Sequence, residues 1–205
     1  MEHPKATSTP RIGRPSKVDE HGTPTRERLL RAAVDACIEF GYDGATLSDI
    51  ARRAEVSTQA IYSHFSGKAA LLVAASKHEL DAITTIRLPG EPGIREIARH
   101  WLHPEFRSTR ILITELHTAS TRQQEVAELL DDWQRDYSAR LAHLLGLSPA
   151  QVTMLYLLLL GLSHADTLTG LDIDDPQIER QVDALIDGWL AASSGDPDCY
   201  YHFPN

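Results

Sequence analysis

Long apolar runs and cysteines are scarce in this chain, and each shortage narrows the class of protein. The most apolar stretch, 152–162 (VTMLYLLLLGL), is far shorter than the roughly 20 residues that a membrane-spanning helix needs, so we expect a buried helix and no membrane partner. Only two cysteines occur, Cys37 and Cys199, and they lie too far apart to indicate a disulfide framework. The segment MEHPKATSTP at the start lacks the apolar core of a secretion signal. We therefore expect a reducing, cytoplasmic environment.

Signatures of catalysis and of metal binding are also missing. The sequence has no glycine-rich phosphate loop, no nucleophile elbow and no carboxylate pair whose spacing demands a catalytic role. His100 and His103 could share a metal ion, but no cysteine-rich or histidine-rich cluster supplies a third ligand. We expect a protein that is not an enzyme and that needs neither a metal nor another cofactor.

The formal net charge of -9 argues against nucleic acid until its distribution is considered. Residues 1–70 hold ten basic and nine acidic residues, whereas the remaining 135 hold ten basic and twenty acidic ones. The segment from Arg11 to Lys17 (RIGRPSK) has three bases and no acid. Because salt screens charges beyond about 10 Å, such a front end can bind DNA in spite of an acidic body.

The apolar positions predict an all-α protein with about nine helices. Apolar residues recur with the helical period, and no stretch alternates as a strand does. We expect a helix from Thr25 that ends at Gly41, a second capped by Thr46, a third capped by Ser57, and a fourth from Lys68 to about residue 85. Five more are expected at about 92–103, 106–119, 122–145, 149–169 and 176–192.

These helices suggest four regions: a flexible basic arm (1–23), a helix-turn-helix domain (24–70), a second helical domain (71–194) and a tail (195–205). Helix 149–169 is apolar nearly all round, and helix 176–192 carries five apolar residues on one expected face. We interpret both helices as a dimer surface, with the core of a single-chain bundle as the alternative. The five residues are Ile178, Val182, Leu185, Ile186 and Trp189.

The stretch 56–72 (VSTQAIYSHFSGKAALL) has the composition of a helix that enters the major groove of DNA. The two short helices after Thr46 and Ser57, joined by residues 54–56, have helix-turn-helix proportions. The first turn of the second helix must carry short polar side chains, because base edges lie close to it. Ile61 and Phe65 should face the core; plain packing is the alternative reading. The candidate DNA contacts are Ser57, Thr58, Gln59, Ala60, Tyr62, His64 and Lys68.

Residues 25–72 resemble the DNA-binding domain of the TetR family of transcriptional regulators. The resemblance rests on Gly-Tyr, Thr-x-x-Asp-Ile-Ala, Val-Ser, Ile-Tyr-x-His-Phe and Lys, in this order after a long helix. It implies an all-helical homodimer with a three-helix DNA reader and a C-terminal domain that binds an inducer and dimerises through its last two long helices. It also implies that Thr46 and Tyr62 contact phosphate, that residues 57–60 read bases, and that His64 and Lys68 contact the DNA backbone.

Two positions depart from many members of that family. Glu55 replaces a frequent glycine in the turn, so we expect a left-handed or distorted residue there that costs about 1 kcal/mol. Gln59 replaces another frequent glycine and can make two hydrogen bonds to adenine, so the DNA sequence preference cannot be taken from a relative.

The arm offers a second DNA contact. Arg11-Ile-Gly-Arg14-Pro15 resembles the Arg-Gly-Arg-Pro core of segments that insert arginine into the narrow minor groove of A·T tracts. A solvated tail is the alternative.

The C-terminal half should hold the ligand cavity that the resemblance implies. Such a cavity has apolar walls and a few polar anchors, and ordinary core packing is the alternative for each aromatic residue. Arg110, Glu115 and His117 are the candidate anchors. The predicted lining is Trp101, Phe106, Arg110, Ile113, His117, Trp133 and Tyr137.

The sequence therefore predicts a dimeric repressor that binds a palindromic operator in double-stranded DNA and is released by a small apolar or amphipathic effector. A sequence-tolerant DNA-organising protein that relies on the arm is the alternative. An enzyme with an appended DNA reader is a third possibility, but no catalytic residues support it.

Overall fold

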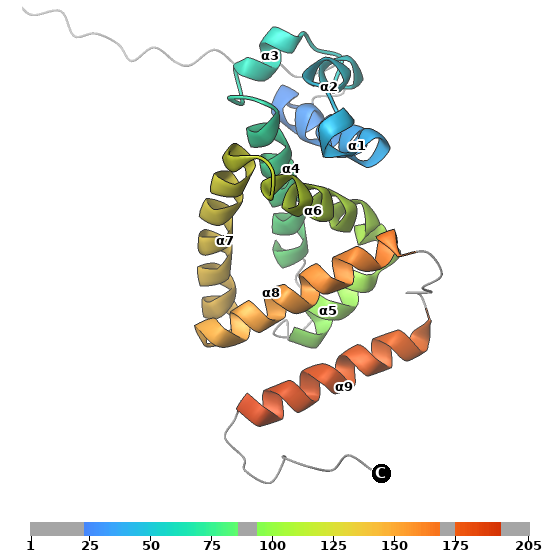
Figure 1. Ribbon diagram of the computed structural model, residues 1–205, viewed down its shortest axis with the longest axis vertical. Helices are drawn as coiled ribbons and strands as arrows, with labels where there is room; N and C mark the ends of the chain where they lie inside the picture. Colours follow the sequence, from blue (N-terminus) through green and yellow to red (C-terminus); the bar gives the residue numbers. More distant parts are fainter. Residues whose placement is uncertain (1–22, 86–93, 169–174, 194–205) are drawn as a thin grey trace, which may run out of the picture.

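The computed structural model describes residues 23–85, 94–168 and 175–193. In these parts of the chain it contains nine α-helices, two short 3₁₀ helices and no strand (Figure 1), so the predicted all-α class is confirmed. The arm with Arg11 and Arg14 and the tail at 195–205 lie outside the described residues. The α-helices are α1 (Thr25–Gly44), α2 (Leu47–Arg53), α3 (Thr58–Tyr62), α4 (Lys68–Thr85), α5 (Ile94–Leu102), α6 (Arg107–Ser120), α7 (Gln124–Leu145), α8 (Pro149–Ser163) and α9 (Pro176–Ser193), and the 3₁₀ helices are η1 (Pro104–Phe106) and η2 (His164–Thr167).

Helix α1 is long and contains a break near its C-terminal end. Gly41 has φ 69° and ψ 174°, which interrupts the helix and sets off a last turn, residues 42–44. Side chains resist a positive φ, so glycine suits this position. The predicted end of the helix at Gly41 thus coincides with the break.

Helices α1, α2 and α3 form one end of the molecule, and α4 leads away from them into the rest of the helices (Figure 1). Ile50 of α2 and Ile61 of α3 are completely buried, and Phe65 is nearly so. All three belong to the same apolar cluster as Val34 of α1. The inward orientation predicted for Ile61 and Phe65 is therefore confirmed.

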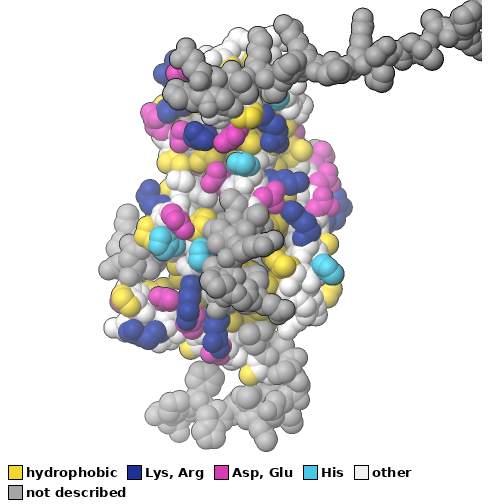
Figure 2. Space-filling model, turned by 180° about the vertical axis from the view of Figure 1, so that it is seen from behind, with side chains coloured by type: hydrophobic (Ala, Val, Ile, Leu, Met, Phe, Trp, Pro, Cys, Tyr) yellow, Lys and Arg dark blue, Asp and Glu magenta, His cyan; other side chains and the backbone are white. Residues whose placement is uncertain are grey.

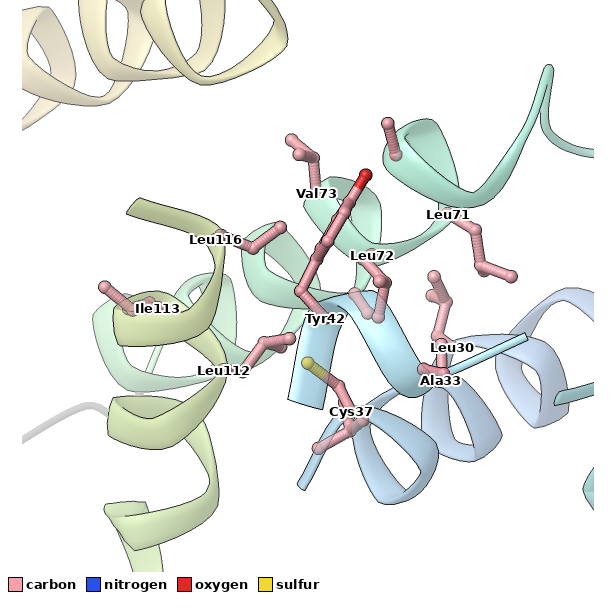
Figure 3. Close-up of a cluster of buried hydrophobic side chains, with 14 of the residues drawn as sticks. Leu30, Ala33, Cys37, Tyr42, Leu71, Leu72, Val73, Leu112, Ile113 and Leu116 are labelled. Atoms are coloured by element: carbon pink, nitrogen blue, oxygen red, sulfur yellow. The ribbon is translucent and has the colours of Figure 1, made fainter. Parts of the chain in front are cut away.

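The cluster continues without a gap from this end into α4, α6 and α7. Cys37 and Tyr42 of α1 lie between Leu112 of α6 and Leu72 of α4 (Figure 3). Complete burial of a leucine contributes about 2 kcal/mol, so residues such as Leu112, with no exposed surface, bind α6 firmly to α1. The predicted domain boundary at residue 70 falls inside α4, which packs in both halves.

A smaller apolar cluster joins α5, α8 and α9. It is built by Ile94, Ala98 and Leu102 of α5, Leu155 of α8, and Val182 and Ile186 of α9. At its edge, Arg99 of α5 pairs with Asp183 of α9.

One detail differs from the sequence prediction, and a second refines it. The helix expected at 149–169 ends at Ser163 and continues as the 3₁₀ helix η2. On α9, Val182 and Ile186 are buried, but Ile178 and Leu185 are exposed. Within this chain, α9 thus buries only the part of its predicted apolar face that packs in the cluster with α5 and α8.

Candidate functional site

Thr46 begins the candidate DNA-binding surface as the cap of α2. Its Oγ1 accepts a hydrogen bond from the Asp49 N–H at 3.1 Å and donates one to the Asp49 carboxylate at 2.5 Å. The bond from Thr46 is the largest cause that lowers the pKa of Asp49, and a second bond from Arg52 acts in the same direction. Thr46 is exposed, so its hydroxyl lies at the surface as the phosphate role requires.

The turn between α2 and α3 contains the distorted residue that the sequence predicts. Glu55 has φ 55°, and it is the only residue other than glycine with a positive φ in the described parts of the chain. The turn is closed by a hydrogen bond from the Val56 N–H to the Ala51 carbonyl at 3.0 Å. Arg28 of α1 holds it by donating to the Ala54 carbonyl at 2.9 Å.

Helix α3 presents a polar first turn to solvent. The Ser57 hydroxyl caps it by accepting from the Ala60 N–H at 3.3 Å. Ser57, Thr58 and Gln59 are exposed and Ala60 is half-buried, whereas Ile61 is completely buried. Ile61 thus anchors the helix in the core, and the predicted base-reading residues 57–59 are exposed to solvent.

Two predicted phosphate contacts follow α3 closely. Tyr62 is 54% exposed, and His64 is also exposed. Phe65 turns inward beneath Arg26, whose guanidinium lies 5.5 Å from the centre of the ring. The predicted contacts Thr46, Tyr62 and His64 therefore all have exposed side chains near the ends of α2 and α3.

Lys68 has partners within the protein. Its Nζ donates to the Tyr42 carbonyl at 2.7 Å and to the Asp43 carbonyl at 3.4 Å, and it lies 4.5 Å from the centre of the Tyr42 ring. A phosphate contact by Lys68 would have to share the ammonium group with the last turn of α1.

Three of the six basic side chains in residues 23–70 pair with acids, and Arg28 and Lys68 donate to backbone carbonyls. Arg52 pairs with Asp49 at 3.1 Å, and Arg53 pairs with Glu39. Figure 2 shows basic and acidic side chains interspersed on the face that it presents. Phosphate contacts from the described residues would therefore rely on hydroxyl groups and backbone N–H groups as much as on free cations.

An apolar cavity of about 40 Å³ lies among α4, α5, α6, α7 and α8. About 10–15 Å³ of such volume is needed for each water molecule, so the cavity has room for roughly three. A typical ligand site of roughly 300–1,000 Å³ is much larger, so this one is small for a ligand. Its lining consists of Leu80, Ile97, Trp101, Ile113, Trp133, Tyr137, Tyr156, Leu159, Leu160 and Ser163.

The polar groups of the cavity wall are neutral and mostly occupied. The Trp101 Nε1 donates to the Leu159 carbonyl at 2.9 Å. The Tyr156 hydroxyl forms a hydrogen bond with the Nε2 of His117. The Trp133 indole is 7% exposed, and its buried Nε1 has no partner among the described residues. Trp133 therefore lines the cavity and also has a buried N–H group without a hydrogen-bond partner.

The titratable groups at the cavity are uncharged near neutral pH, and burial favours their uncharged forms further. Burial raises the pKa of Tyr137 and that of Tyr156 to about 12 each. It lowers the pKa of His117, which stands behind Tyr156. The walls thus offer no full charge to a ligand.

Four of the seven predicted ligand-binding residues line the cavity: Trp101, Ile113, Trp133 and Tyr137. Phe106 packs instead beside His100, with ring centres 6.0 Å apart. Arg110 is completely buried and pairs with Asp166, while it also donates to the His103 carbonyl at 3.1 Å. His117 reaches the cavity only through Tyr156. The sequence prediction placed these three residues at a ligand. In the structure, they contact other residues of the protein instead.

The sequence prediction missed Leu80, Ile97 and all four lining residues of α8. The near-uniform apolar character of α8 hides which of its sides faces a cavity, so no periodic signal could have identified Tyr156 or Leu159.

The described residues contain no group of three or more His, Cys, Asp or Glu side chains that could hold a metal ion. His103 accepts a hydrogen bond from the Glu105 N–H at 3.4 Å as the cap of η1. Among the helices of these same segments, none alone is long and apolar enough to cross a membrane; α7 and the α8–η2 segment pass such a test only together, and they are bent by 111°.

Two family models match the chain. Residues 29–75 match the model of bacterial regulatory proteins of the tetR family. Residues 92–192 match the tetracyclin repressor-like C-terminal domain. Together the two matches cover well over half of the chain.

Two proteins of similar sequence are named as transcriptional regulators. The HTH-type transcriptional repressor AcnR of Corynebacterium diphtheriae is 32% identical over 127 residues, which cover 58% of this chain and 66% of AcnR. The HTH-type transcriptional regulator SrpR of Pseudomonas putida is 40% identical over 60 residues, 28% of each chain. The matched segments span less than two thirds of the length of either relative.

Solved structures share the fold over most of the chain. Salmonella enterica GusR superposes with a TM-score of 0.59 at 22% identity, covering 80% of this chain and 94% of GusR. The multidrug binding protein EbrR, complexed with ethidium, superposes with a TM-score of 0.58 at 24% identity, covering 77% of this chain and 95% of EbrR. With both family models matched, the chain belongs to the TetR family, whose members are DNA-binding transcriptional regulators and not enzymes.

Proposed function

We propose that this regulator binds a palindromic operator as a homodimer, represses transcription there, and is released by a small apolar or amphipathic effector. The observation that carries the proposal is the polar first turn of α3, where Ser57, Thr58 and Gln59 are exposed above the buried Ile61. A helix anchored in this way can insert its first turn into the major groove. The designation of the relative AcnR as a repressor supports the direction of regulation.

The residues of the surface have distinct roles in this proposal. Gln59 reads an adenine with its side-chain amide, and Ala60 lies near a thymine methyl group. Thr46, Tyr62 and His64 contact phosphates on either side of the groove and fix the register of the helix. Lys68 supports the last turn of α1 and adds its charge near the duplex.

The proposed dimer forms through α8 and α9. Met154 and Leu157 on α8 are 53% and 54% exposed, and Leu185 on α9 is 59% exposed. Large apolar side chains on two neighbouring helices favour burial against a second copy of the same surface. Symmetric pairing presents two α3 helices, which must lie about 34–36 Å apart to enter successive major grooves.

The effector occupies the apolar cavity. Its neutral aromatic walls favour an uncharged ligand with an aromatic or apolar body. The ethidium complex of EbrR supports ligand binding by this fold. Since the cavity is small, a ligand must push α6 and its neighbours apart.

Selection of duplexes from a random-sequence library by the purified protein tests the proposal. We expect a palindrome with half-sites one helical turn apart. Gln59→Ala should then relax the preference at one base pair in each half-site by about 1–3 kcal/mol. Equal weakening on every duplex would reject the base-reading role of Gln59.

A further inference from the structure

The break in α1 is held by a residue of α6. At Gly41 the chain leaves the helix, and the Tyr42 N–H donates to the Glu115 Oε2 at 2.7 Å. A Cβ atom at position 41 would lie 3.1 Å from that same oxygen. The positive φ strongly favours glycine at position 41, and a side chain there would also press on the Glu115 carboxylate.

The short turn after the break is also tied to the corner between α6 and α7. The Tyr42 hydroxyl donates to the Gln123 Oε1 at 3.1 Å. The Asp43 carboxylate accepts from Arg122 at 2.7 Å and from the Gln123 Nε2 at 3.2 Å. With Tyr42 only 2% exposed, the turn is held by groups from the C-terminal half on several sides.

The other side of this turn contacts the DNA-binding helices. Lys68, the first residue of α4, donates to the Tyr42 and Asp43 carbonyls. Thr46, the cap of α2, follows only two residues after Gly44. A shift of the turn would therefore move the starts of α2 and α4, the two helices that flank α3 in the chain.

Helix α6 joins this turn to the cavity. Ile113 lines the cavity, and Glu115 lies two residues later. Because successive residues of an α-helix are about 100° apart, the two side chains point to nearly opposite sides of α6. Figure 3 shows Ile113 turned away from the side of α6 on which Leu112 meets α1. Displacement of α6 by a ligand would carry the Glu115 carboxylate with it.

We propose that Glu115 is a positioning residue that transmits the state of the cavity to the DNA-binding helices through its hydrogen bond to the Tyr42 backbone. This inference rests on the proposed function, since it requires a cavity whose filling alters DNA binding. It goes further by naming Glu115, which contacts the break in α1 directly from α6, as a residue that carries this coupling.

The test replaces the unidentified effector with side chains that fill the cavity. Ile113→Phe pushes on α6 from the cavity side, and Leu159→Phe does so from α8 if the first variant does not fold. Each is combined with Glu115→Ala and, as a matched control, with Thr118→Ala, an exposed position on the same helix. The duplex selected by the wild-type protein is the probe, and circular dichroism confirms the helicity of every variant.

Cavity filling should weaken binding of this duplex at least about fivefold in the wild-type and Thr118→Ala backgrounds, the lower end of ordinary allosteric coupling. In the Glu115→Ala background the loss should be clearly smaller than in the Thr118→Ala background, because the Glu115 contact is removed while those of Arg122 and Gln123 remain. Amide hydrogen exchange at Tyr42 should be accelerated by Glu115→Ala and by cavity filling, but not by Thr118→Ala.

Three results would overturn the inference: an equal loss of binding in the Glu115→Ala background, no effect of cavity filling in the wild type, or complete loss of binding by folded Glu115→Ala alone. A failure of the proposed function would be recognised separately, because the wild-type protein would then select no preferred duplex.

Discussion

Glu55 and Gly146 both have a left-handed backbone conformation, but only Glu55 has a side chain. Glu55 has φ 55° and Gly146 has φ 65°, and a Cβ atom at Gly146 would meet nothing within 4 Å. The left-handed conformation costs a residue with a side chain about 1–2 kcal/mol. Glycine avoids this cost, but it lowers the free energy of unfolding by about 0.4–1 kcal/mol because the unfolded chain has greater freedom.

This pair yields a prediction about stability. Glu55→Gly should raise the free energy of unfolding by about 0.5 kcal/mol, and Gly146→Ala should lower it by about 0.5–1 kcal/mol. Urea denaturation of both variants measures the difference. Equal destabilisation by the two substitutions would show that conformational strain at residue 55 is not what distinguishes them.

Several weak acids that are shielded from water, including Cys37, Tyr137 and Tyr156, predict how the free energy of unfolding changes at high pH. Burial raises the pKa of Cys37 from 9.0, and the pKa values of Tyr137 and Tyr156 from 10.0, to about 12 in each case. Well below pH 9.0 both the folded and the unfolded chain keep these protons. Between pH 9.0 and about 12 the unfolded chain releases protons that the folded chain retains, so the free energy of unfolding should fall as pH rises.

Denaturation by urea between pH 8 and 11 tests this sign. Tyr137→Phe should make the decline shallower because one of the three groups is removed. A free energy of unfolding that stays constant or rises over this range would contradict the prediction.

At the scale of helices, the sequence predicted the N-terminal half better than the C-terminal half. Gly41 marks the break in α1, and Thr46 and Ser57 cap the starts of α2 and α3. Such local capping and backbone preferences are displayed directly by a sequence. The side of α8 that faces the cavity depends on distant helices and leaves no periodic signal. The partner of Lys68 was missed for the same reason, because it lies in the last turn of α1, 26 residues away.

Helices α8 and α9 carry the prediction about the dimer. Leu157→Glu and Leu185→Glu place charges on exposed apolar positions of the two helices, and they should shift the protein toward monomers because buried charge without a partner is costly. Light scattering coupled to size-exclusion chromatography measures the mass. Leu144→Glu is the control, since Leu144 is 51% exposed but belongs to α7. A wild-type monomer, or equal dissociation by the control, would contradict the proposed interface.

For the whole molecule, charge is distributed unevenly along the chain. The net charge is -9, yet residues 1–70 hold one more basic than acidic residue. If the arm with Arg11 and Arg14 contacts the minor groove, deletion of residues 1–20 should weaken operator binding and reduce the slope of affinity against salt concentration by about one unit for each lost phosphate contact. An unchanged slope would show that the arm makes no contact with the DNA.

The central claim is that two α3 helices of one dimer insert into successive major grooves of one duplex. Hydroxyl-radical footprinting of the selected duplex tests it most directly. The account predicts two protected segments one helical turn apart on the same face of the DNA, about 10 base pairs from centre to centre, which a combined Ser57→Ala, Gln59→Ala and Tyr62→Phe variant abolishes. A single protected segment, or protection that survives these substitutions, would contradict it.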